Sequence, residues 1–202
     1  MVAGIILLGW SVVAAVLVHF DPAPNKLDAW GFSAFPSEYH DAFLLRVTEL
    51  RTLPILVIGS ALAALTVVGR DRWRVIACLV GPVAAVVIVE WLMKPLIGRR
   101  LGMVLDYPSG SVTVVAGMAT AWALAVPRTI RWAVIVVGSA VVAMVMVAVV
   151  RLGWHYPTDA LAGAIVGVGV VLSLDGTLQF LRTERADLMT SGHRDRSGSH
   201  QN

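Results

Sequence analysis

The sequence predicts an all-α membrane protein, a polytopic bundle of about six transmembrane helices. Its 202 residues are 57% hydrophobic and only 14% charged, whereas charged residues make up about a quarter of an average soluble domain. The mean hydropathy is +0.78. Long apolar runs rich in Val, Ala, Leu and Gly carry this hydrophobicity, and no segment alternates as a half-buried strand does.

Each apolar run is close to the length that a membrane span requires, about 20 residues for roughly 30 Å of hydrocarbon. The first run lacks a basic start and is followed by no small-x-small cleavage site, so we interpret it as a span and not as a signal peptide. The six predicted spans are residues 2–20, 52–69, 75–93, 110–127, 132–150 and 158–180.

The arginines orient these spans, because positively charged loops stay on the cytoplasmic side. Residues 69–74 hold three arginines, residues 127–131 hold two, and the stretch after Leu181 holds four. With six spans all three segments lie on one side, so we expect a plasma-membrane protein with both termini in the cytoplasm. The net charge of +3 is then explained by topology, and we expect no nucleic-acid partner. The loops predicted to face outward are 21–51, 94–109 and 151–157.

The chain divides into a membrane domain, residues 1–182, and a polar tail, residues 183–202. The tail composition is typical of disorder, and we expect a disordered cytoplasmic segment. Within the outward loop 21–51, a short amphipathic helix is expected between Ser37 and Arg51. The single cysteine, Cys78, excludes an intramolecular disulfide and a thiolate metal site.

Unusual polar residues gather in three outward segments, each at a point where a span meets the outer face. They are Lys94-Pro-Leu-Ile-Gly-Arg-Arg100, Asp106-Tyr-Pro-Ser-Gly-Ser111 and His155-Tyr-Pro-Thr-Asp159. Polar side chains at such positions are costly and are functional candidates. We expect the helices to bring the three segments into one pocket at the membrane surface.

The chemistry of this predicted pocket suits a phosphate. Lys94, Arg99 and Arg100 supply positive charge, and a guanidinium binds two oxygens at once. Ser109 and Gly110 open a helix whose free N–H groups favour an anion, although a serine there can simply cap the helix. Glu90 precedes Lys94 by four residues, so the two are expected to pair on one helix face.

His155 is the titratable group in the pocket that is suited to attack phosphorus at neutral pH. Pro157 is typical of the start of a helix, which puts Asp159 in the first turn. From there Asp159 is expected to accept a hydrogen bond from one imidazole nitrogen and leave the other with a free lone pair.

The order lysine–arginine, Pro-Ser-Gly and His-x-x-x-Asp resembles the type 2 phosphatidic acid phosphatase superfamily. The resemblance covers about residues 75–175, and the stretch from Leu152 to Gly163 is its most specific part. It implies a helical core, a lipid phosphate or diphosphate substrate, and a phosphohistidine intermediate with no metal or other cofactor. His155 would be the nucleophile and Asp159 its partner, and the phosphate would be bound by Lys94, Ser109 and Gly110.

Three positions depart from the family pattern. Leu101 and Gly102 stand where Arg-Pro is usual, so Arg99 and Arg100 are the candidate substitutes. Ser111 replaces the usual histidine after Pro-Ser-Gly and is counted with the phosphate-binding residues. Arg151, a further candidate phosphate ligand, lies four residues before His155 where the family has six, and on a continuous helix that shift turns the side chain by about 200°.

Ser111 is too weak an acid to protonate a leaving group, a step typically worth about 10²–10⁴-fold. A diphosphate suffers less, because its leaving phosphate has a pKa of about 6. The sequence therefore favours a polyprenyl diphosphate as substrate. The alternative is a phosphatase-fold protein with impaired catalysis that binds lipid phosphates or a membrane partner. The sequence does not define the oligomeric state.

Overall fold

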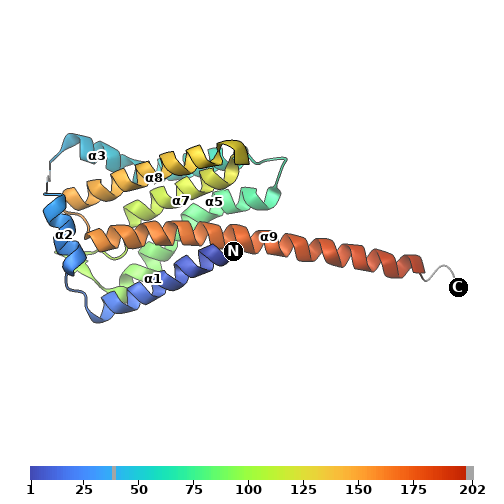
Figure 1. Cartoon of the computed structure of the whole chain (residues 1–202), viewed down its shortest axis with the longest axis horizontal. Helices are drawn as coiled ribbons and strands as arrows, with labels where there is room; N and C mark the ends of the chain where they lie inside the picture. The colour runs from blue at the N-terminus through green and yellow to red at the C-terminus, as the bar shows by residue number, and fades with distance from the viewer. Residues whose placement is uncertain (38–39, 199–202) are drawn as a thin grey trace.

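The computed structural model describes residues 1–37 and 40–198. Within them, helices joined by loops make up the regular structure, apart from one short hairpin (Figure 1). The main helices, with the 3₁₀ turn η1 and the π-helical segment η2, are α1 Val2–Phe20, α2 Lys26–Ala34, α3 Ala42–Thr48, η1 Glu49–Arg51, α4 Leu53–Leu65, α5 Arg72–Val87, η2 Ile88–Met93, α6 Lys94–Ile97, α7 Gly110–Ala125, α8 Arg128–Arg151 and α9 Pro157–Gly198. The antiparallel hairpin pairs β1 Arg100–Leu101 with β2 Val104–Leu105.

The predicted all-α membrane bundle is confirmed as a fold class. Within the described residues, four helices are long and apolar enough to span a membrane: Val2–Phe20, Arg72–Ile97, Arg128–Arg151 and Pro157–Arg185. A fifth span is present if α3–η1 and α4, bent by 54°, count together. The fourth predicted run, residues 110–127, forms α7, an apolar helix of 16 residues. The number of spans and the side of the termini stay predictions.

Helix α7 is the centre of the bundle, with α5, α8 and α9 around it (Figure 1). Almost every residue in its first two turns is buried, among them Val112, Thr113 and Val115. The outer helices α1, α5 and α8 instead expose large apolar side chains such as Val13, Val80 and Val137. Such a surface is suited to lipid and not to water.

Two glycines, Gly163 and Gly167, let α9 approach α7 closely, as small residues do where membrane helices pack. A Cβ on Gly163 would lie 2.3 Å from the backbone oxygen of Ser109, and one on Gly167 would lie 2.6 Å from that of Thr113. The Thr113 hydroxyl donates to the Gly163 carbonyl at 3.0 Å. This contact fixes the start of α7 against the start of α9, where two of the predicted motifs lie.

Asp71 joins the start of α5 to the middle of α9. Its carboxylate caps α5 through the N–H groups of Trp73 and Arg74, at 3.2 Å each. The Gln179 side-chain amide, on α9, donates to the other carboxylate oxygen at 2.9 Å. One side chain thereby satisfies free helix-end donors and ties two helices together.

Two predicted boundaries differ from the structure. Helix α9 continues to Gly198, beyond the predicted end of the sixth span at residue 180, and the disorder expected of the tail stays a prediction. The domain boundary at residue 182 stays a prediction. The outer helix expected between Ser37 and Arg51 is shorter, because α3 begins only after its cap, Asp41.

Candidate active site

Three chain segments converge where α9 begins. Gly153, with a φ of +68°, ends α8 in a conformation that other residues rarely adopt, and the turn after it carries His155. Asp106 follows the β1–β2 hairpin, and Asp159 lies in the first turn of α9. The Ser109 N–H donates to the Asp159 carbonyl at 2.9 Å, which joins the second and third predicted segments directly.

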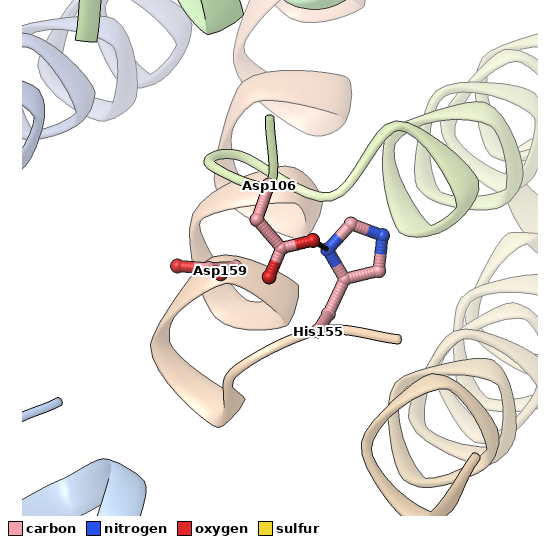
Figure 2. Close-up of side chains that lie close together, drawn as sticks. All are labelled: Asp106, His155 and Asp159. Atoms are coloured by element: carbon pink, nitrogen blue, oxygen red, sulfur yellow. Dashed lines mark ion pairs between the residues drawn. The ribbon is translucent and has the colours of Figure 1, made fainter. Parts of the chain in front are cut away.

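The imidazole of His155 faces Asp106 and not the expected Asp159 (Figure 2). Nδ1 lies 2.7 Å from Oδ1 of Asp106. Asp159 is nearby, since the ligating atoms of all three side chains lie within 4.8 Å of one another. Its carboxylate is directed elsewhere because it binds Arg99. The predicted orienting role of Asp159 is therefore corrected: the carboxylate at the ring nitrogen belongs to Asp106.

The guanidinium of Arg99 is enclosed by protein acceptors. It is 2% exposed, and it binds the Asp28 carboxylate at 2.7 Å and also the Asp159 carboxylate. Its other contacts are the Pro22 and Ala23 carbonyls and the Thr158 hydroxyl. The expectation that Arg99 holds phosphate is corrected for this arrangement, because its donors are already in use.

Asp28 is the site residue that sequence reasoning missed. It lies in α2, within a capping box with Asn25, and its carboxylate accepts hydrogen bonds from the Thr158 N–H and hydroxyl at 3.0 and 2.7 Å. Burial alone would raise the pKa of Asp28, but these bonds and that from Arg99 hold it below its ordinary value. The capping box is visible in the sequence, whereas a partner 71 residues away is not.

The contacts that lower the pKa of Asp28 raise the pKa of Arg99. Burial alone would lower the pKa of its guanidinium, but the hydrogen bond to Asp28 and the charge of Asp159 raise it above the ordinary value. Arg99 therefore stays charged and links α2, the hairpin and α9. The ring of Tyr156 lies against the guanidinium, with its centroid 4.1 Å away.

Lys94 pairs with Glu90 as expected, at 2.8 and 2.9 Å from the two carboxylate oxygens. Glu90 lies in η2, a π-helical segment between α5 and α6; such segments are frequent at functional sites. A Cβ on Gly110 would lie 2.0 Å from the Glu90 Oε1 atom and 3.7 Å from the Lys94 Nζ atom. The lysine thus lies at the start of α7, but a protein carboxylate shares that position.

The remaining predicted phosphate ligands lie in different surroundings. Ser109 is fully buried and caps α7, with its hydroxyl 3.5 Å from the Val112 N–H. Ser111 is 5% exposed, in the first turn of α7. Arg100 is exposed on β1, and its guanidinium reaches the Met103 carbonyl at 3.4 Å. Arg151 ends α8 and donates to the Pro36 carbonyl at 3.3 Å.

Tyr107 adds a second buried group that the sequence reasoning did not single out. Its side chain is 2% exposed and packs in an apolar cluster with Ile97 and Ala162. Burial raises the pKa of its hydroxyl to about 12, so the phenol remains neutral.

The arrangement of these helices is that of the transmembrane PAP2-type phosphatases, which confirms at the level of fold the resemblance stated from the motifs. The solved structure that carries this likeness is the "first transmembrane PAP2 type phosphatidylglycerolphosphate phosphatase from Bacillus subtilis". The two chains align with a TM-score of 0.67 at 20% identity, over 88% of this chain and 96% of the other. No family model matches the sequence, and no curated protein matches it.

Proposed function

We propose that this protein is a membrane lipid phosphatase that hydrolyses a lipid phosphate or diphosphate at the outer face of the plasma membrane. The observation that carries the proposal is the buried contact between the Nδ1 atom of His155 and Asp106 at 2.7 Å. It lies within a fold shared with a transmembrane PAP2-type phosphatase. A carboxylate at one ring nitrogen favours nucleophilic attack by the other.

In the proposed reaction the Nε2 atom of His155 bonds to the terminal phosphorus while the bond from that phosphorus to the leaving oxygen breaks; the leaving group is the lipid alcohol of a monophosphate or the lipid monophosphate of a diphosphate. The leaving oxygen departs with the electron pair, and Asp106 stabilises the positive charge that develops on the ring. Water then attacks phosphorus and breaks the P–N bond, which releases inorganic phosphate and restores the imidazole. The two steps together consume one water and need no oxidant or reductant.

Lys94 and the N-terminus of α7 at Gly110 are the proposed binding groups for the phosphoryl oxygens. Their closeness supports this role, since a helix N-terminus and a lysine both favour an anion. Arg100 and Arg151 are proposed to meet the phosphate from the rim. Arg99 is proposed to act indirectly, by holding Asp159 and therefore the start of α9.

The proposed preference is for a polyprenyl diphosphate over a monophosphate. Ser111 stands beside Gly110 in the first turn of α7 and supplies no acid of suitable strength. A phosphate leaving group with a pKa of about 6 needs less protonation than an alkoxide does. The absence of a general acid, typically worth about 10²–10⁴-fold, would therefore penalise the monophosphate most.

An apolar cavity of about 480 Å³ supports a lipid substrate. It lies between α1, the α5–α6 region and α9, and Met93 and Ile97 in its wall flank Lys94 in the sequence. Polar atoms are nearly absent from the lining, with Ser11 and His19 as exceptions. We propose that the hydrocarbon chain of the substrate lies in this cavity.

One observation favours the second candidate, a binding protein with impaired catalysis. Glu90 lies against Gly110 and pairs with Lys94, so a carboxylate stands where the proposed phosphate would bind. A protein with this arrangement could bind a lipid headgroup weakly without turning it over.

The deciding experiment is phosphate release by purified protein in lipid nanodiscs, with polyprenyl diphosphate and phosphatidate as separate substrates. We expect release from the diphosphate by wild type and its loss in His155→Ala. Equal, background-level release by both proteins would reject the phosphatase and leave the binding role. Equal turnover of the two substrates would reject only the diphosphate preference.

A further inference from the structure

We propose that Asp106, His155 and Asp159 form a binding site for one divalent transition-metal cation. Each side chain offers a ligand atom, and these atoms lie within 4.8 Å of one another. Figure 2 shows Asp106 turned toward the imidazole of His155, with Asp159 next to them on the first turn of α9 and its side chain directed away from the ring. No other such group of three potential ligands occurs among the residues that the structure describes.

Unsatisfied buried atoms point to a ligand in this region. Asp106 is 1% exposed and His155 is 8% exposed, yet neither the Oδ2 atom of Asp106 nor the Nδ1 atom of His155 makes a hydrogen bond. The Nδ1–Oδ1 separation of 2.7 Å is therefore a close approach without hydrogen-bond geometry. Buried polar atoms normally have a partner, and a cation between these two atoms would give both of them one.

The balance of charge around the cluster allows for a bound cation. Asp28, Asp106 and Asp159 are each at most 1% exposed, and Arg99 is the cation that contacts the first and the third of them. One guanidinium does not balance three ionised buried carboxylates, so the remaining charge is met by a proton on a carboxyl or on His155, or by a bound dication.

The ligand set selects the kind of metal. One imidazole nitrogen and two carboxylate oxygens are typical ligands of Zn²⁺ and Mn²⁺, whereas Mg²⁺ prefers oxygen ligands and retained waters. Three protein ligands leave a coordination position for water. Tyr156 and Thr158 precede Asp159 in the chain. The Tyr156 N–H donates to the Asp159 Oδ2 atom at 3.3 Å, which helps to hold that carboxylate in place.

The effect of this metal site on catalysis rests on the proposed phosphatase function. A metal on the Nδ1 atom leaves the proton of a neutral imidazole on Nε2, and that nitrogen then lacks the lone pair needed to attack phosphorus. Occupancy and phosphohistidine formation would exclude each other. Metal binding is therefore expected to inhibit the phosphatase and not to assist it.

The test is metal binding by the full-length protein in nanodiscs after removal of metals with a chelator. We expect one equivalent of Zn²⁺ by isothermal titration and elemental analysis, and a Co²⁺ spectrum with nitrogen and oxygen ligands. Asp106→Asn and His155→Gln should each weaken binding by more than the roughly 10–100-fold typical of outer-shell changes. The matched controls His40→Gln and Asp175→Asn, which change a histidine and a buried acid elsewhere, should bind as wild type does.

Absence of 1:1 binding in wild type, or unchanged binding in both folded site variants, would overturn the site. If one variant does not fold by circular dichroism, the other variant and the wild-type Co²⁺ spectrum decide. Phosphate release is measured in parallel, with inhibition by Zn²⁺ expected over the same concentrations as binding. Release without Zn²⁺ binding would reject the metal site alone, and Zn²⁺ binding without any release would reject the phosphatase alone.

Discussion

Asp106 lies against the imidazole of His155, with 2.7 Å between Oδ1 and Nδ1, while Asp159 of the same cluster binds Arg99. The two aspartates therefore have different tasks in the proposed site. Asp106 acts on the ring, and Asp159 acts on the framework that carries the ring.

Asp106→Asn should lower the rate of phosphate release by roughly 10²-fold or more, because an amide stabilises a positive imidazole ring poorly. The measurement is kcat with polyprenyl diphosphate in nanodiscs. Asp21→Asn, an exposed change at the end of α1, is the matched control and should leave kcat unchanged. Wild-type kcat in Asp106→Asn would contradict the assignment.

Arg99→Met should destabilise the protein by about 3–5 kcal/mol, because it leaves two buried carboxylates without their cation. The measurement is the midpoint of unfolding in detergent. Arg46→Met is the control: Arg46 and its partner Glu49, 3.7 Å away, are 80% and 58% exposed, so the change should stay within about 0.5 kcal/mol. Adding Asp28→Asn to Arg99→Met should restore part of the loss. Equal effects of the two arginine changes would show that Arg99 is not the link described above.

Glu90→Gln should tighten the binding of phosphate by roughly two- to fivefold, the effect expected of a partly exposed ion pair. The change removes the carboxylate that pairs with Lys94 at 2.8 Å and lies against Gly110. The measurement is inhibition by inorganic phosphate, together with KM for the diphosphate. Weaker phosphate binding in this variant would indicate instead that Glu90 positions the lysine.

Ser111→His should increase turnover of phosphatidate more than turnover of polyprenyl diphosphate. The imidazole would supply an acid to the alkoxide leaving group, a contribution typically worth about 10²–10⁴-fold when well placed. Ser111→Asn, which adds volume without a suitable acid, is the control. A similar gain in both variants, or none in the histidine variant, would argue against the missing-acid explanation.

Acid should weaken the junction of α5 and α9 through Asp71. Burial alone would raise the pKa of this carboxyl, but the hydrogen bond from Gln179 and those at the helix start hold it below the ordinary value of 3.8. A lowered pKa in the folded state means that this stabilisation is present above about pH 3.8 and is lost as the pH falls through the folded pKa. The unfolding midpoint should fall over that range in wild type and fall less in Asp71→Asn. Identical pH profiles would exclude Asp71 as the cause.

Much of the fold follows from local patterns in the sequence. The six apolar runs all appear as helices, because each run is long and its hydrophobicity does not depend on distant residues. The pairing of Glu90 with Lys94 was predictable for the same reason, since four residues on one helix fix their separation. The hairpin after Arg99 and the length of α9 were not predicted, because short strands and helix ends depend weakly on local composition.

The sequence by itself determined that this is a helical membrane protein and that Lys94, Ser109 and His155 lie at or near the ends of its apolar segments. Only the tertiary structure decided which carboxylate meets the imidazole and that Arg99 is enclosed by Asp28 and Asp159. The physical reason is that these contacts join segments far apart in the chain, 71 residues in the case of Arg99 and Asp28. Close approach of α7 and α9 at Gly163 sets the final geometry, and no local pattern specifies where two buried charges will meet.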